Sequence, residues 1–366
     1  MISNINKIII ATGGTGGHVF PAYSLAKHLM EKKNEVEIIS DERGIKYLKN
    51  FRDIKITKII STTLFRKNIF KFFFSILIIL YSILKSLIYL FFNKPKLVFG
   101  MGGYSSFPVC IAAKMLRIPF IIYENNLQIG KANKYLLPFA SKIFVSSLKL
   151  EGIEKKYDNK VCEIGNIIRK EILNFKIKKP KELKNKKLNI LILGGSQAAK
   201  VFAERLPAIF EECKKAKILL KIYQQCLFSQ KELLISKYKN LKIEFEIFNF
   251  SDNLLEYFSK ADLAITRSGS SMLAELINVR MPFISIPLPS SADNHQLKNA
   301  IYYEKNQYSY LVEEKDLSKK LFKLIKLIYE DDLLLDQIIN KQKKYSDNSV
   351  YENIDREMIK VINEKN

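Results

Sequence analysis

The stretch KIIIATGGTGGHVFPAYSLAKHL, residues 7–29, determines the fold that we expect. A run of isoleucines leads into five residues of which four are glycine, and a histidine and an amphipathic segment follow. This order is typical of a buried strand, a tight turn and a helix, the opening unit of a Rossmann-like domain. Glycines let the backbone approach a ligand, and a helix N-terminus offers free N–H groups, so the turn suits an anion.

Two familiar phosphate-binding motifs do not fit this turn. A P-loop needs Gly-Lys-Ser/Thr after four spacer residues, whereas His18 stands five places after Gly13. A dinucleotide fingerprint beginning at Gly14 needs a third glycine where Val19 stands. The turn therefore indicates neither ATP nor NAD. His18, at the start of the helix, is a candidate functional group, and its alternative is an ordinary core histidine.

The same pattern returns near the middle of the chain. LNILILGGSQAAKVFAERL, residues 188–206, is again a strand, a glycine turn and a helix, and it follows a charged stretch at 175–187. A length of 366 residues is also typical of two domains. We therefore expect an α/β protein with two Rossmann-like domains, whose parallel sheets face each other across a cleft.

Three further segments carry candidate ligand-binding groups. GMGGYSSFP, residues 100–108, is a second glycine turn of the first half. Glu275 lies one turn into the helix that follows RSGS, where its carboxylate suits a ribose diol; the alternative is an ordinary surface glutamate. DNHQ, residues 293–296, offers amide and imidazole groups for sugar hydroxyls.

The composition limits the classes of partner and compartment. The net charge of +23 favours nucleic acid, an anionic membrane surface or a phosphorylated substrate, or it reflects a general drift towards Lys, Ile and Asn. The four cysteines show no C-x-x-C spacing, which argues against a zinc site or a disulfide framework and fits a reducing cytoplasm. The apolar run at the N-terminus is too short for a signal peptide.

Residues 72–92, FFFSILIILYSILKSLIYLFF, contain a single charge and are long enough to span a bilayer as a helix. A single crossing would separate two strands that we expect in one sheet. We therefore favour a helix that packs one side on the protein and inserts its Phe-rich side into a membrane surface, with Arg66, Lys67 and Lys71 near the headgroups. The remaining alternative is a fully buried helix. The polar residues recur at helical spacing: Asn68, Lys71, Ser75, Ser82, Lys85, Tyr89 and Asn93.

Taken together, these motifs resemble those of the MurG family, the glycosyltransferase family 28 enzymes that add GlcNAc to lipid I in peptidoglycan synthesis. The shared motifs, in the family's order, are TGGTGGHVFPAYSLA, GMGGYSSFP, YENN, GNIIR, GGSQAA, RSGSSMLAE and DNHQLKNA. The resemblance implies a GT-B fold with an acceptor- and membrane-binding domain at 1–167, onto which the helix at 347–366 packs, and a UDP-GlcNAc-binding domain at 168–346. It implies inverting transfer of GlcNAc from UDP-GlcNAc to the C4 hydroxyl of MurNAc in lipid I, which gives lipid II.

The resemblance also implies roles for individual residues. Asn126 and Gln296 contact GlcNAc, Ser196 lies at the phosphates and Glu275 at the ribose. His18 is the candidate base because of its position at the start of the helix after the glycine turn. The implied donor-binding set is Thr15, Gly16, Gly17, Asn126, Arg169, Ser196, Ser251, Ser270, Ser271, Met272, Leu273, Ala274, Glu275 and Gln296. The implied acceptor-side or secondary set is Gly13, Gly14, Gly102, Gly103, Tyr104 and His295.

The resemblance further implies a peripheral enzyme on the cytoplasmic face of the cell membrane, bound through residues 64–92, with cell-wall synthesis proteins as candidate partners. UDP-GlcNAc is then a substrate, and no cofactor is expected. Because the sequence contains no Asp-x-Asp triplet, we expect no essential metal. The chain departs from the family's usual residues at Ile167, Ala198 and Met272, where proline, glycine and threonine are common.

Other functions remain as alternatives. The nearest is another GT-B UDP-sugar transferase that acts on a different lipid or on a small acceptor. A UDP-GlcNAc 2-epimerase would leave the apolar segment unexplained, and a non-catalytic membrane scaffold would leave His18 and Glu275 without a role. A nucleic-acid binder is the weakest alternative, because the sequence lacks an interleaved aromatic and basic motif.

Overall fold

The computed structural model describes residues 7–49, 51, 53–63, 69–176, 187–195, 200–249, 254–331 and 333–364. The chain divides into two compact units. The first comprises Met1–Arg169 with Asp347–Asn366, and the second comprises Lys170–Ser346. The roles assigned to the two halves from the sequence stay predictions.

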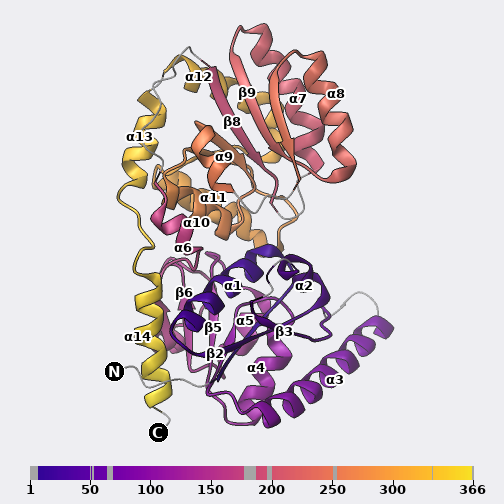
Figure 1. Cartoon of the computed structure of the whole chain (residues 1–366), viewed down its shortest axis with the longest axis vertical. Helices are drawn as coiled ribbons and strands as arrows, with labels where there is room; N and C mark the ends of the chain where they lie inside the picture. The colour runs from indigo at the N-terminus through magenta and orange to yellow at the C-terminus, as the bar shows by residue number, and fades with distance from the viewer. Residues whose placement is uncertain are drawn as a thin grey trace. The chain divides into compact units, whose positions relative to one another are not determined.

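Across the described residues, the first unit forms a seven-stranded sheet in the order β3-β2-β1-β4-β5-β6-β7, with every neighbouring pair parallel (Figure 1). Its strands are β1 Lys7–Thr12, β2 Glu35–Ser40, β3 Lys55–Lys58, β4 Leu97–Gly100, β5 Phe120–Glu124, β6 Lys142–Val145 and β7 Val161–Glu163. Its α-helices are α1 Gly16–Glu31, α2 Glu42–Leu48, α3 Ile69–Asn93, α4 Ser106–Met115, α5 Lys131–Leu136 and α14 Val350–Asn363.

The second unit repeats the design with six strands among its described residues, in the order β10-β9-β8-β11-β12-β13, and all of its pairs are parallel. Its strands are β8 Lys187–Leu193, β9 Leu219–Gln225, β10 Glu244–Phe248, β11 Leu263–Thr266, β12 Phe283–Ser285 and β13 Tyr310–Leu311. Its α-helices are α6 Lys170–Asn174, α7 Lys200–Lys215, α8 Lys231–Asn240, α9 Leu254–Lys260, α10 Ser270–Val279, α11 His295–Lys305, α12 Phe322–Glu330 and α13 Leu333–Gln342.

The predicted fold class, two Rossmann-like α/β domains with parallel sheets, is confirmed. Ile8, Ile9 and Ile10 in β1 are all fully buried, because helices cover both faces of a parallel sheet. The strand order reverses between β1 and β4 in the first sheet, and between β8 and β11 in the second. Ligands of such sheets bind beyond the carboxyl ends of the strands at this reversal, so the fold places a candidate site after each of these strands.

Helix α3 packs on the rest of the first unit through small residues. Ser75, Ser82 and Ser86 are buried, Ser82 Oγ donates to the Ile60 carbonyl at 2.7 Å, and α3 lies beside α4 (Figure 1). The large apolar side chains point outward and are each more than half exposed: Ile69, Phe70, Phe73, Phe74, Leu77, Leu80, Tyr81, Leu84, Ile88, Phe91 and Phe92. The fully buried alternative is therefore wrong.

The strands before and after α3 decide between the other two alternatives, a membrane-spanning helix and a helix that inserts one side into a membrane surface. The helix is long and apolar enough to cross a membrane. However, β3 before it and β4 after it belong to one sheet, with β2 and β1 between them. A single crossing is therefore incompatible with this fold. The serines of the predicted polar stripe face the protein, whereas Lys71 and Lys85 are exposed; Arg66, Lys67 and Asn68 lie outside the described residues.

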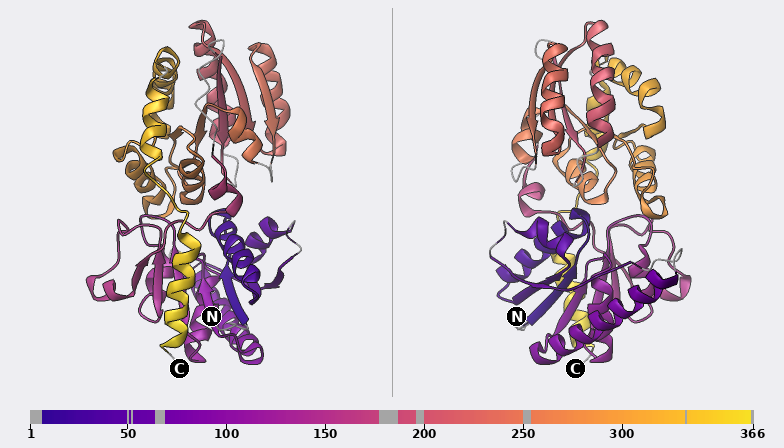
Figure 2. Two further views of the ribbon diagram at one scale, coloured as in Figure 1. Left: turned by 60° about the vertical axis from the view of Figure 1, so that its left-hand side comes forward. Right: turned by 90° about the vertical axis from the view of Figure 1, so that its right-hand side faces the viewer.

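Helix α14, near the end of the chain, packs on the first unit (Figure 2). His28 Nε2 of α1 lies 2.9 Å from Asp355 Oδ1, and Tyr351 Oη donates to the Ile168 carbonyl at 2.7 Å. The His28 and Tyr351 rings also stack, with their centroids 4.5 Å apart. These polar contacts fix the register of the helix on α1 and on the segment after β7.

Glu37 in β2 joins the sheet to α3 and yields a prediction about pH and stability. Its carboxylate is 1% exposed, accepts hydrogen bonds from Thr57 and Tyr89, and pairs with Lys55. Burial alone would raise the pKa of Glu37, but these donors outweigh it and hold the pKa below the ordinary 4.5. Because hydrogen bonds to charged groups contribute about 1.5–3 kcal/mol, Glu37→Gln should lower the free energy of unfolding by about 2 kcal/mol at pH 7.

The stabilisation by Glu37 is fully present above pH 4.5, the ordinary value, and is lost as the pH falls through the lower pKa of the folded state. Urea unfolding from pH 7 downwards should therefore show a constant difference between wild type and variant that shrinks below pH 4.5. Glu35→Gln is the matched control, because this glutamate of the same strand is 65% exposed and, among the described residues, pairs with Lys7. Equal effects of the two substitutions would contradict the prediction.

Candidate active site

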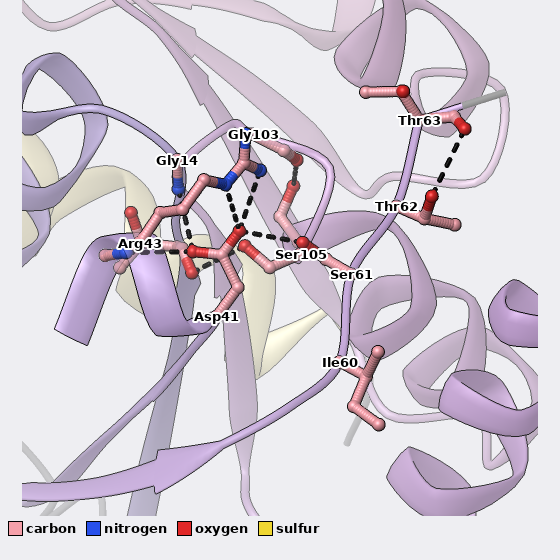
Figure 3. Close-up of polar contacts among 12 residues, drawn as sticks. Gly14, Asp41, Arg43, Ile60, Ser61, Thr62, Thr63, Gly103 and Ser105 are labelled. Atoms are coloured by element: carbon pink, nitrogen blue, oxygen red, sulfur yellow. Dashed lines mark hydrogen bonds and ion pairs between the residues drawn. The ribbon is translucent and has the colours of Figure 1, made fainter. Parts of the chain in front are cut away.

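The glycine turns after β1 and β4 meet at the strand reversal of the first sheet. Gly103 has a φ of +79°, and a Cβ there would lie 2.6 Å from the Gly13 carbonyl oxygen. Ser105 Oγ donates to the Thr12 carbonyl at 2.7 Å and so holds the second turn against the end of β1 (Figure 3). Only glycine at position 103 allows this close approach, which brings the predicted residues Gly13, Gly14 and Gly103 together.

His18 lies on the same pair of turns. Its backbone N–H donates to the Thr15 carbonyl at 3.1 Å, which starts α1, and Gly16 and Gly17 form the first turn of the helix. A Cβ at Gly102 would lie 2.6 Å from His18 Nδ1, so the imidazole packs directly on this glycine. Tyr104, the next predicted residue, is 39% exposed. The structure thus groups the candidate base with the glycine turns, and its chemical role stays a prediction.

Asp41, which the sequence analysis did not select, holds the first turn from the side. It follows β2 and is the N-cap residue of α2, where its Oδ1 accepts the Gly44 N–H at 2.9 Å. The same oxygen accepts the Gly14 N–H at 3.0 Å, while Oδ2 accepts from Ser61 Oγ at 2.7 Å and from Arg43 Nη2 at 2.8 Å (Figure 3). Burial raises the pKa of Asp41, but these donors outweigh it and keep the pKa below its ordinary value.

Asn126 follows β5, and a buried glutamate fixes its position. Glu124 Oε1 accepts both the backbone N–H of Asn126, at 3.1 Å, and its side-chain amide, at 3.0 Å. Glu124 Oε2 accepts from Gly130 N–H at 2.9 Å. The neighbouring Asn125 donates to the Gly17 carbonyl at 3.0 Å, so the end of β5 is tied to the first glycine turn. Asn126 therefore belongs to the same group as His18.

In the second unit, the segment RSGS after β11 is held by buried polar groups. Arg267 Nη1 donates to the carbonyls of Ile286 and Pro287, both at 3.2 Å, and its Nη2 pairs with Glu314 at 2.5 Å. Asn299 of α11 donates to the Ser268 carbonyl at 3.1 Å. These bonds place the start of α10 at the strand reversal of the second sheet.

The predicted donor-binding residues of α10 differ in exposure. Ser271 and Met272 are half-buried, whereas Ser270 and Glu275 are 8% and 7% exposed. Leu273 and Ala274 are fully buried, so their side chains pack in the core, and their predicted part in donor binding stays a prediction that concerns their backbone groups. Ser196 and Ser251, together with Ala198, lie outside the described residues.

Gln296 and His295 start α11 after a short 3₁₀ turn. Gln296 Oε1 accepts the Leu288 N–H at 3.0 Å, which fixes the side chain, while His295 is half-buried and its Nδ1 lies 2.7 Å from the Ala292 carbonyl. Arg169 is half-buried and is the last residue of the first segment of the first unit. In the described part of the chain, no group of three or more His, Cys, Asp or Glu side chains is placed to hold a metal ion.

Comparison with known proteins agrees with this arrangement. Residues 8–145 match the glycosyltransferase family 28 N-terminal domain, and residues 189–356 match the C-terminal domain of the same family. The chain belongs to glycosyltransferase family 28. It is therefore a glycosyltransferase, and the fold recognised in the sequence is that of this family.

Relatives of this family-28 chain extend over nearly its whole length. A UDP-N-acetylglucosamine–N-acetylmuramyl-(pentapeptide) pyrophosphoryl-undecaprenol N-acetylglucosamine transferase from Pelagibacter ubique is 37% identical, covering 98% of this chain and 99% of the relative. The protein of the same name from Rickettsia canadensis is 36% identical, covering 93% and 96%. The crystal structure of Acinetobacter baumannii MurG is similar with a TM-score of 0.75 and 25% identity, covering 98% and 99%.

At Ile167, where the chain departs from the family's usual proline, the structure contains a hydrogen bond that proline could not make. Ile167 stands where proline is common, and its buried N–H donates to Tyr123 Oη at 2.9 Å. Proline has no N–H and could not make this bond. The substitution therefore comes with a hydrogen bond between the segment after β7 and Tyr123, near the end of β5.

Proposed function

We propose that this chain transfers GlcNAc from UDP-GlcNAc to the C4 hydroxyl of MurNAc in lipid I, with inversion, and so makes lipid II. The observation that carries the proposal is the 37% identity that extends over 98% of the chain to a relative named for this reaction. The grouping of His18 with the paired glycine turns, at a strand reversal where such folds bind ligands, supports it.

In the proposed mechanism, His18 takes the proton of the acceptor hydroxyl as its oxygen attacks the anomeric carbon. The bond between that carbon and the UDP oxygen breaks, and UDP leaves with the electron pair. Its growing negative charge requires donors, which the N-terminus of α10 and Arg169 supply in this proposal. Glu275 holds the ribose, and Asn126 and Gln296 orient the GlcNAc.

This proposal is tested by transfer of labelled GlcNAc from UDP-GlcNAc to a lipid I analogue, with EDTA present. Removal of a general base typically lowers the rate by about 10²–10⁴-fold, so His18→Ala should lower kcat by at least about 100-fold and leave UDP binding intact. Glu275→Ala should raise the KM for UDP-GlcNAc. Glu304→Ala, an exposed glutamate on α11, is the matched control and should leave both constants unchanged.

A wild-type protein that binds UDP-GlcNAc but gives no product with lipid I would contradict the proposed acceptor. Product from a diacylglycerol or a small aglycone instead would assign the chain to another transferase reaction. Loss of product on addition of EDTA would contradict the expected metal independence.

We also propose that the protein binds the cytoplasmic membrane face peripherally through residues 64–92. The outward side of α3 carries eleven exposed large apolar residues, of which Phe70 is 83% and Phe92 is 76% exposed. Lys71 and Lys85 are exposed on the same helix and suit anionic headgroups. A surface of this kind would bring the enzyme to a lipid-linked acceptor.

Sedimentation with phosphatidylglycerol-containing vesicles tests the membrane proposal. Each exposed Leu or Phe that inserts contributes about 1.5–3 kcal/mol, so Phe73→Ser, Leu77→Ser and Leu84→Ser together should weaken binding by at least about 100-fold. Phe228→Ser with Leu233→Ser, exposed apolar residues of the second unit, is the control. Unchanged binding of the triple variant would contradict the proposal. Failure of alkaline carbonate to release the wild-type protein from the vesicles would also contradict it, because a peripheral protein should be released.

A further inference from the structure

Asp41 differs from an ordinary helix N-cap in the number of donors that converge on it. The side chain is buried, with 3% of the residue exposed, and four residues donate to its two oxygens. An N-cap aspartate needs only the amide of its own helix, which is Gly44 here. The bonds from Gly14, Ser61 and Arg43 therefore serve something other than the start of α2.

The bond from Gly14 fixes the first glycine turn. Gly14 has a φ of +81°, and its N–H points to Asp41 Oδ1 at 3.0 Å. The carboxylate also fills the space beside the preceding residue, since a Cβ at Gly13 would lie 2.7 Å from Oδ1. The Gly14 N–H is thus already bonded to the Asp41 carboxylate. The conformation of the turn that leads to His18 depends on this bond.

The bond from Ser61 connects the same carboxylate to the segment that leads to α3. Ile59 N–H donates to the Ser40 carbonyl at 2.9 Å, and Ser61 Oγ donates to Asp41 Oδ2 at 2.7 Å (Figure 3). Between these two residues, the Ile60 carbonyl accepts from Ser82 of α3. The apolar helix and the glycine turn are therefore held by one continuous set of hydrogen bonds through Asp41.

Arg43 balances the charge of Asp41. Its Nε and Nη2 donate to Asp41 Oδ2 at 3.2 and 2.8 Å, and its side chain is 56% exposed. Nη2 lies 3.9 Å from the place a Cβ would take on Gly14, so the guanidinium lies alongside the turn (Figure 3). A bare carboxylate here would repel an incoming diphosphate, and the guanidinium cancels that repulsion.

We propose that Asp41 is a positioning residue for the lipid-diphosphate acceptor: it holds the Gly13–Gly14 turn in place, and Arg43 neutralises it so that an anionic acceptor is admitted. This inference rests on the proposed function, since it concerns the acceptor side of that reaction. Asp41 acts through the turn and not on the reacting atoms. The UDP part of the donor, whose predicted contacts include Glu275 and Arg169, does not depend on it.

The test compares steady-state kinetics of wild type and Asp41→Asn with lipid I analogue and UDP-GlcNAc. An amide cannot accept all of these hydrogen bonds, so kcat/KM for the acceptor should fall by about tenfold or more, while the Kd for UDP stays unchanged. Glu42→Gln is the matched control, because this neighbouring carboxylate is exposed and pairs with Lys58 on the surface. Ser61→Ala, which removes one donor and keeps the charge, should give a smaller effect in the same direction.

A double-mutant cycle tests the role of Arg43. Arg43→Ala should raise the KM for the acceptor about tenfold in the wild-type background and should add nothing in the Asp41→Asn background, where no charge needs balancing. An equal effect of Arg43→Ala in both backgrounds would overturn the charge-balancing role.

Two further outcomes separate this inference from the proposed function. If wild type makes lipid II and Asp41→Asn and Ser61→Ala do so equally well, or if the affinity for UDP falls as much as kcat/KM for the acceptor, the positioning role of Asp41 is overturned and the proposed function stands. If wild type gives no product with lipid I, the proposed function is overturned, and the inference that rests on it falls too.

Discussion

The close approach of two backbone turns, after β1 and β4, is the constraint on which the candidate site of the first unit depends. The Gly13 carbonyl lies where a Cβ on residue 103 would be, so neither turn can move without the other. Asp41 holds the outer side of this pair through the Gly14 amide, and Ser105 holds the inner side through the Thr12 carbonyl. His18 packs on the same pair of turns, so its position follows from theirs.

The second unit uses a different means to fix its loops. Arg267 and Asn299 donate to backbone carbonyls and so hold the segment before α10. In the first unit the Asp41 carboxylate holds backbone N–H groups, and Ser105 and Asn125 hold backbone carbonyls; in the second unit the side chains of Arg267 and Asn299 hold backbone carbonyls. In both cases the buried polar groups lie beside the predicted ligand residues at the start of the following helix, α1 or α10.

Much of the fold followed from the sequence, because strand, glycine turn and helix are local patterns and occur at the start of both units. The residues that hold the glycine turns and Asn126 in place could not be predicted from the sequence. Asp41 and Glu124 resemble an ordinary helix cap and an ordinary strand end, and their partners at Ser61 and Asn133 become neighbours only after folding. Hydropathy alone likewise left the placement of α3 open, and the small residues Ser75, Ser82 and Ser86 show which side packs on the protein.

Amide hydrogen exchange of Gly14 tests most directly whether one buried carboxylate organises the acceptor side. We expect the Gly14 amide to exchange slowly in the wild type and at least about tenfold faster in Asp41→Asn, since the loss of a charged acceptor frees this N–H to open. The amides of β8 in the second unit should exchange alike in both proteins. Equal exchange of Gly14 in the two proteins would show that the turn holds its shape without Asp41 and would contradict this account.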